Sequence, residues 1–229
     1  MQYLSNNDIE LLKRYLNIED TNDLWILSKK WTMSKDINEM TNSELQEYTK
    51  GKTILSFTGC FCPPHTGHYN TLMRAILKIK PDIVFLHTVN YGRHGTPVEH
   101  TIDTWKEWGK IIKELNNVDI LIGGPRRMST AEDNSYPEKV ILLYVNEESE
   151  QIEERLEKIN VTLSKGFWEH VPRNKIFTYY INRIGSFSAS KFIECLKTQK
   201  DCLEYVPNII EKKDQYINNI REKYAGQLK

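Results

Sequence analysis

The sequence predicts an α/β fold in which a parallel five-stranded sheet carries helices on both faces. Five short apolar runs recur from Thr53 onward, and the polar segments between them are long enough to form helices. Unbroken apolar runs are typical of parallel strands buried on both faces, and crossover helices connect such strands. The five runs are TILSFT, DIVFLHTV, VDILIG, KVILLYV and KIFTYYI.

The segments before and after the sheet predict helices. In residues 1–51, three stretches with apolar positions at three- and four-residue spacing follow a potential capping residue, the second across LWILSKKW and the third across ELQEYT. We therefore expect an N-terminal helical extension (1–51), a main domain (52–210) and a C-terminal helix that packs on it (211–229).

Composition and charge exclude several classes of protein. The 229 residues suffice for one core and a small appendage, and the 31 basic residues balance 31 acidic ones, which argues against a nucleic-acid partner. No apolar run approaches the roughly 20 residues that span a bilayer, and the N-terminus does not resemble a signal peptide. With only four cysteines, we expect a cytoplasmic protein without a membrane partner. The sequence leaves a homo-oligomer open.

The stretch GCFCPPHTGH, residues 59–68, follows the first strand and precedes a predicted helix across YNTLMRAILKIK. It therefore places His65 and His68 at a helix N-terminus, where unpaired N–H groups and the positive end of the helix dipole attract anions. Gly67 allows a phosphate to approach the backbone, and Gly59 allows a tight turn. Both histidines can donate N–H bonds to phosphate oxygens. We therefore predict a phosphate site.

A zinc site is the alternative interpretation of the same stretch, because it contains two cysteines and two histidines. Structural zinc sites usually place a long segment between two pairs of ligands, so that four groups can surround one ion. Here Cys60, Cys62, His65 and His68 lie within nine residues at a stiff Pro-Pro turn. We therefore favour the phosphate site and predict no metal ligand among these residues.

These residues resemble the G-x-F-x-P-x-H-x-G-H signature of the nucleotidyltransferase superfamily with the H-x-G-H motif. The matching positions are Gly59, Phe61, Pro63, His65, Gly67 and His68. The Pro-Pro-His form is most similar to the nicotinate-mononucleotide adenylyltransferase branch. The resemblance implies a Rossmann-like fold and a nucleotidyltransferase domain across residues 52–210. The family commonly has Ser or Thr at the position of Cys60 and Asp at that of Cys62, so both are departures.

A second motif follows the last strand. Ser188-Ala189-Ser190-Lys191 resembles the family's carboxyl-terminal I-S-S/T-T-x-x-R motif, in which a helix start holds the outer phosphates of the nucleotide. An ordinary capped helix is the alternative. The family's closing cation falls on Ile193, a departure, but Arg183 or Lys191 can supply the charge.

The resemblance implies roles for individual residues. The expected catalytic residues are His65, His68 and Lys191. The expected nucleotide-binding residues are Thr58, Gly59, Cys60, Phe61, Gly67, Arg183, Ser188 and Ser190. The expected acceptor-binding residues, which follow the second and third strands, are Asn90, Arg93, Arg126 and Arg127; solvated loops are the alternative for these four. Trp105 and Trp108, at helical spacing, are expected in the core rather than against a base.

The resulting functional hypothesis is transfer of a nucleoside monophosphate to a phosphorylated small molecule. A nucleoside triphosphate and such an acceptor are the expected partners, with Mg²⁺ bound mainly through the nucleotide phosphates. AMP transfer from ATP to nicotinate or nicotinamide mononucleotide is favoured. A cytidylyltransferase that activates a phospho-alcohol is one alternative, supported by the position of Arg183. A nucleotide-binding regulator without activity is the other, motivated by Cys60, Cys62 and Ile193.

Overall fold

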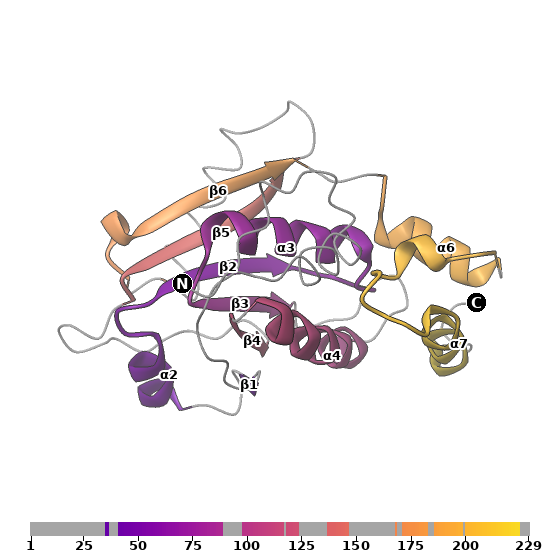
Figure 1. Cartoon of the computed structure of the whole chain (residues 1–229), viewed down its shortest axis with the longest axis horizontal. Coiled ribbons are helices and arrows are strands. Elements are labelled where there is room, and N and C mark those ends of the chain that lie inside the picture. Colours follow the sequence, from indigo (N-terminus) through magenta and orange to yellow (C-terminus); the bar gives the residue numbers. More distant parts are fainter. Residues whose placement is uncertain are drawn as a thin grey trace, which may run out of the picture.

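The sheet of the computed structural model contains parallel strands in the order β1-β4-β3-β2-β5-β6 (Figure 1). The structure describes residues 35–36, 41–88, 98–116, 118–123, 137–146, 168, 171–182, 186–198 and 200–224. Every strand pair within this part of the chain is parallel. The strands are β1 (Lys35–Asp36), β2 (Thr53–Gly59), β3 (Ile83–Thr88), β4 (Asp119–Gly123), β5 (Lys139–Asn146) and β6 (Ile176–Asn182).

The five strands predicted from the apolar runs are confirmed, and β1 is an addition. Lys35 pairs with Leu121 and Asp36 with Ile122, so β1 extends the sheet at the β4 edge. The sequence analysis expected only helices in residues 1–51. This short polar strand corrects that expectation; two charged residues carry no apolar pattern that could have identified them as a strand.

The order of the strands creates a switch point beside β2. After β2 the chain adds β3 and β4 on one side, and then returns to place β5 and β6 on the other. In open parallel sheets, ligands bind beyond the carboxyl ends of the strands at the point where the direction of strand addition reverses. The loop that follows β2 therefore starts at the most favourable position for a ligand.

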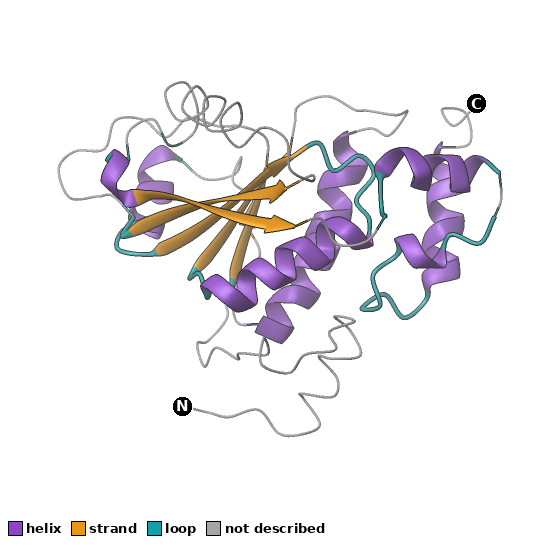
Figure 2. Ribbon diagram, turned by 90° about the horizontal axis from the view of Figure 1, so that it is seen from above, coloured by secondary structure: helices purple, strands orange, loops and turns teal. Residues whose placement is uncertain are grey.

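In the described part of the chain, the long helices lie against one face of the twisted sheet, and the short helix α2 contributes to the core on the other (Figure 2). Side chains alternate along β2, so Leu55 and Phe57 face one core cluster, which includes residues of α3, α4, α6 and α7, whereas Ile54 faces a second one with Leu45 of α2 and Trp168. The helices are α2 (Asn42–Thr49), α3 (Thr66–Ile79), α4 (Val98–Asn116), α6 (Ala189–Lys197) and α7 (Lys213–Tyr224), with short 3₁₀ helices η3 (Arg173–Lys175) and η4 (Leu203–Tyr205).

Helix α2 confirms the third helix expected in the N-terminal region. Thr41 accepts a hydrogen bond from the Glu44 N–H, and the Glu44 carboxylate accepts one from the Thr41 N–H, which is a complete capping box. The first two expected helices lie outside the described residues. No helix in the described part of the chain is long and apolar enough to cross a membrane.

The C-terminal segments are connected by a disulfide. Cys195, near the end of α6, is bonded to Cys202, the residue before η4. Beyond η4, Ile217 and Ile220 of α7 are buried in the larger core cluster. The small number of cysteines led us to expect a cytoplasmic protein, and no pattern in the sequence indicated this pair.

Candidate functional site

The loop after β2 leads directly into α3 at the switch point. Thr58 is exposed near the end of β2, and Phe61 adopts a left-handed backbone conformation with φ of 48°. The Cys62–Pro63 peptide bond is cis. A Cβ on Gly59 would lie 2.7 Å from the Phe61 ring, so the glycine lets the ring fold back over the end of the strand.

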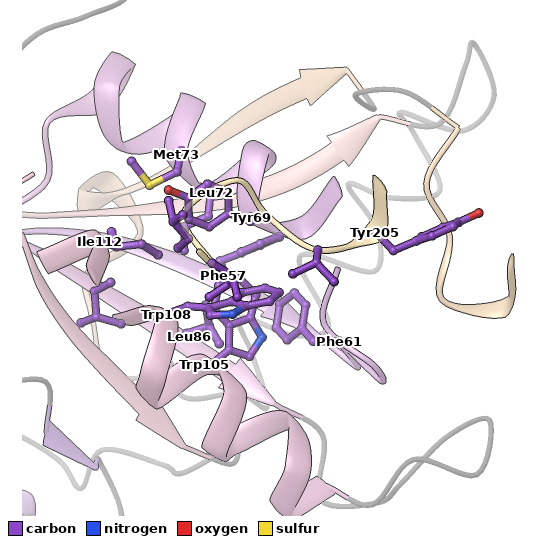
Figure 3. Packing of buried hydrophobic residues seen from close by; sticks show 14 of the residues in the cluster. Phe57, Phe61, Tyr69, Leu72, Met73, Leu86, Trp105, Trp108, Ile112 and Tyr205 are labelled. Carbon is purple, nitrogen blue, oxygen red and sulfur yellow. The ribbon is translucent and has the colours of Figure 1, made fainter. Parts of the chain in front are cut away.

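The Phe61 ring anchors this loop in the core (Figure 3). It makes edge contacts with Phe57, Trp105 and His68, at ring-centroid distances of 4.9, 5.5 and 5.1 Å. Trp105 and Trp108 are fully buried, which confirms that they belong to the core and are not available to a base. Phe61 therefore connects the rigid aromatic core to the ring of His68.

Helix α4, which carries Trp105, also holds the backbone of the same loop through Thr101. The Thr101 hydroxyl donates a hydrogen bond to the Phe61 carbonyl at 3.1 Å and lies 3.2 Å from the Cys62 sulfur. The Cys62 thiol also donates to the Cys60 carbonyl. Cys62 is thus buried against α4, while Cys60 is partly exposed. Among the described residues, no group of three His, Cys, Asp or Glu side chains is placed to hold a metal ion, and the zinc interpretation has no geometric support.

His65 and His68 lie face to face at the N-terminus of α3. Their ring centroids are 3.8 Å apart, with 24° between the planes. His65 is the N-cap residue, and its Nδ1 accepts a hydrogen bond from the Gly67 N–H at 3.1 Å. An Nδ1 that accepts carries no proton, so the ring is neutral and its Nε2 carries the hydrogen. This tautomer presents an N–H donor beside the positive end of the helix dipole.

The second motif meets the first at Gly67. A Cβ on Gly67 would lie 3.0 Å from the Phe187 Cβ, so the segment before α6 packs directly on the first turn of α3. Ser188 caps α6 by accepting a hydrogen bond from the Lys191 N–H at 3.2 Å. The Lys191 ammonium donates to the Ser186 carbonyl at 3.5 Å, and Ser190 is exposed in the first turn. Two helix N-termini therefore lie near each other beyond the carboxyl end of β2 (Figure 1).

The 3₁₀ helix η4 bridges these two termini. The Thr66 hydroxyl donates to the Glu204 carbonyl at 2.8 Å. The Tyr205 ring stacks on Phe192 at 5.0 Å with 4° between the planes, and meets Phe187 edge-on at 5.8 Å. Sequence reasoning missed the roles of Thr66 and Phe187. Thr66 lies inside the H-x-G-H motif, but its partner is distant in the chain, so no local pattern identifies the contact.

Several expected site residues cannot be placed. Those outside the described part of the chain are Asn90, Arg93, Arg126, Arg127 and Arg183. Ile193, at the position of the family's closing cation, is buried in the core with 8% of its surface exposed, so α6 carries no positive charge at that position. Of the two cations expected in this motif, Lys191 lies in the described part of the chain and Arg183 does not.

Comparison with solved structures identifies the class of fold. No protein-family model and no curated protein matches the sequence. The structure is similar to a bifunctional NMN adenylyltransferase/ADP ribose pyrophosphatase from Francisella tularensis, with a TM-score of 0.52, 12% identity, and coverage of 77% of this chain and 52% of that one. The structure of that enzyme with AMP and a Mn ion gives a TM-score of 0.50, 11% identity and the same coverage.

The chain thus spans about half the length of these two solved structures. At this identity the likeness concerns the fold: a Rossmann-like α/β fold with a parallel sheet, as predicted. More particularly, this fold is shared with the bifunctional NMN adenylyltransferase/ADP ribose pyrophosphatase of Francisella tularensis.

Proposed function

We propose that this chain is a nucleotidyltransferase that transfers AMP from ATP to a phosphorylated acceptor, such as nicotinate or nicotinamide mononucleotide, and releases pyrophosphate. The observation that carries the proposal is the stacked pair His65 and His68 at the N-terminus of α3, next to the N-terminus of α6. Two helix N-termini at one edge of a sheet offer N–H groups and positive dipole ends to one polyphosphate. The Pro-Pro-His form of the motif favours ATP and a mononucleotide acceptor.

The reaction requires no covalent enzyme intermediate. A phosphate oxygen of the acceptor attacks the α-phosphorus, and the bond from this phosphorus to the bridging oxygen breaks, so pyrophosphate leaves with the electron pair. His65 and His68 would donate hydrogen bonds to the phosphate oxygens as charge develops on them. Ser188 and Lys191 would face the leaving pyrophosphate, where a cation stabilises the growing negative charge. The contribution of the protein is therefore positioning and charge neutralisation.

Mg²⁺ would enter as part of the substrate, bound to the triphosphate. Mg²⁺ prefers oxygen ligands in octahedral geometry. The side chains between β2 and α3 that could bind a metal are thiols and imidazoles, and no group of three acidic, histidine or cysteine side chains in the described part of the chain is placed to hold a metal ion. These residues do not fit a protein-held Mg²⁺ site, and we assign no step to one.

The test is pyrophosphate release by the wild-type protein and the His68→Ala variant. The wild type should release pyrophosphate from ATP in the presence of nicotinate or nicotinamide mononucleotide. Loss of one transition-state donor costs about 2.7–4 kcal/mol, so His68→Ala should lower kcat by about 10²–10³. Lys191→Ala should also lower kcat, whereas Lys197→Ala, an exposed cation in the last turn of the same helix, should not. An unchanged rate in His68→Ala would contradict the mechanism.

A regulator that binds nucleotide without turnover is the second candidate. Two observations favour it: the family's acidic position is occupied by the buried thiol of Cys62, and its closing cation by the buried Ile193. Such a protein would bind ATP but release no pyrophosphate with any acceptor. Running the same assay with CTP and phospho-alcohols also tests the cytidylyltransferase alternative, which would show turnover with CTP and not with ATP.

A further inference from the structure

We propose that Thr66 is a positioning residue that fixes the distance between the two phosphate-binding helix termini. This inference rests on the proposed function and names a residue to which the family motif assigns no role. The Thr66 side chain is largely buried, and its hydroxyl donates a 2.8 Å hydrogen bond to the carbonyl of Glu204 in η4. The bond connects the first turn of α3, between His65 and Gly67, to a segment that follows α6.

The other side of η4 contacts the start of α6. Tyr205, next to Glu204, stacks on Phe192 and meets Phe187 edge-on. These two phenylalanines lie on either side of the Ser188–Lys191 cap. A continuous path of contacts therefore runs from the hydroxyl of Thr66 through η4 to the N-terminus of α6. A shift of η4 relative to α3 would move one phosphate-binding terminus away from the other.

The η4 segment is itself held in place by several contacts, so the bond from Thr66 can fix the position of α3 relative to η4. The Cys195–Cys202 disulfide closes the loop just before it, and the Leu203 N–H donates to the Asp201 carboxylate at 2.9 Å. From α7, the Lys213 ammonium donates to the Leu203 carbonyl at 3.4 Å. None of these three contacts involves α3. The hydrogen bond of Thr66 is a polar link that ties this anchored segment to the histidine-bearing helix.

A nearby threonine provides a matched control. The Thr71 hydroxyl, also largely buried in α3, donates to the Gly67 carbonyl at 2.8 Å, which is a bond within one helix. Removing the Thr71 hydroxyl eliminates a hydrogen bond of the same length and type as that of Thr66, and it leaves the bond between α3 and η4 intact. The two variants make the same change in side-chain chemistry. Thr66→Val removes a bond between α3 and η4, whereas Thr71→Val removes a bond within α3.

The experiment measures kcat, the KM for ATP and the KM for the acceptor, together with the melting temperature, in Thr66→Val, Thr66→Ser and Thr71→Val. In the proposed function, the triphosphate is the ligand that would contact both termini. Thr66→Val should therefore raise the KM for ATP by about tenfold, the equivalent of one lost buried hydrogen bond, and leave the KM for the acceptor unchanged. Thr66→Ser keeps the hydroxyl and should restore the wild-type KM. Thr71→Val should lower the melting temperature without raising either KM.

Two results would overturn the inference. One is an unchanged KM for ATP in Thr66→Val, and the other is an equal rise in Thr71→Val, since that would reflect general destabilisation. If the wild type shows no turnover, the proposed activity fails separately, and the dissociation constant of ATP replaces KM. Weaker ATP binding in Thr66→Val alone would still support the positioning role, and equal binding in all four proteins would refute it.

Discussion

Gly67 and Phe187 are in such close contact that a single added methyl group on the glycine would reach the phenylalanine. A Cβ at position 67 would lie 3.0 Å from the Phe187 Cβ and 3.0 Å from Cε1 of the His65 ring. The absent side chain of Gly67 is therefore what allows the H-x-G-H helix, the ring of its first histidine and the start of α6 to meet at one point.

Gly67→Ala should impair both stability and nucleotide binding. The new methyl group must push either the His65 ring or the backbone around Phe187, and overpacking of this kind costs about 1–3 kcal/mol. We expect a lower free energy of unfolding in urea and a higher KM for ATP. Gly109→Ala in α4 is the matched control, because the nearest atom to its Cβ would be Ile122 Cδ1 at 3.5 Å, an ordinary contact.

In that control, the alanine should stabilise the protein by up to about 1 kcal/mol, since alanine favours helices more than glycine does. The KM for ATP should stay at the wild-type value. If Gly67→Ala behaved like Gly109→Ala, the close packing between the two motifs would not matter for the site.

The sequence was sufficient to predict the sheet because each of the five main strands is a short, mainly apolar run, even where it is only half-buried, as β6 is with Phe177 47% exposed. Every residue of β3, from Ile83 to Thr88, is buried, and no local feature competes with this signal. The two residues of β1, Lys35 and Asp36, are held in the sheet by pairing with β4. Their strand conformation depends on tertiary context, which the local sequence does not encode.

The site was partly predictable for a similar reason. The strand, the glycines and the start of α3 are local features, so the positions of His65 and His68 follow from a few neighbouring residues. The contacts that assemble the site are not local. Thr66 bonds Glu204, and Thr101 holds the carbonyl of Phe61, across long stretches of chain, and such pairs leave no spacing pattern in a single sequence.

Reduction of the Cys195–Cys202 disulfide should destabilise the C-terminal part of the fold. The two cysteines are 7 residues apart, and closing a loop of that size corresponds to about 2.5 kcal/mol in the chain-entropy model. We expect a lower melting temperature in dithiothreitol than in oxidising buffer. The double variant Cys195→Ser, Cys202→Ser should melt at the lower temperature in both buffers, and Cys60→Ser should keep the difference. A melting temperature independent of the reductant would argue against the bond in solution.

The buried hydrogen bond between Trp168 and Ser56 should be important for the second core cluster. The indole N–H of Trp168 donates to the Ser56 hydroxyl at 3.0 Å, and both side chains are almost completely buried. Ser56→Ala removes the acceptor and should cost about 1–3 kcal/mol. In a double-mutant cycle, Ser56→Ala should cost much less in a Trp168→Phe background, because phenylalanine has no donor to satisfy. If Ser56→Ala lowered the free energy of unfolding in urea equally in the two backgrounds, this hydrogen bond would make no contribution to stability.

His87 should make the protein sensitive to mild acid. Burial in β3 lowers the pKa of His87 from its ordinary value of 6.5 to about 4. Above pH 6.5 the imidazole is neutral in both the folded and the unfolded chain, and it makes no pH-dependent contribution. Between pH 6.5 and pH 4 the unfolded chain binds a proton that the folded chain does not, so the free energy of unfolding falls as the pH falls. At 1.36 kcal/mol for each pKa unit, the loss approaches about 3 kcal/mol.

The measurement is urea unfolding of the wild type and of His87→Gln at several pH values from 8 to 4. Glutamine does not titrate, so the difference in unfolding free energy between the two proteins should be constant from pH 8 to pH 7 and should then shift in favour of the variant as the pH falls. Other acidic and basic groups affect both proteins alike, and their contributions cancel in this difference. A difference that stayed constant down to pH 4 would mean that His87 takes up its proton in the folded state as readily as in the unfolded chain.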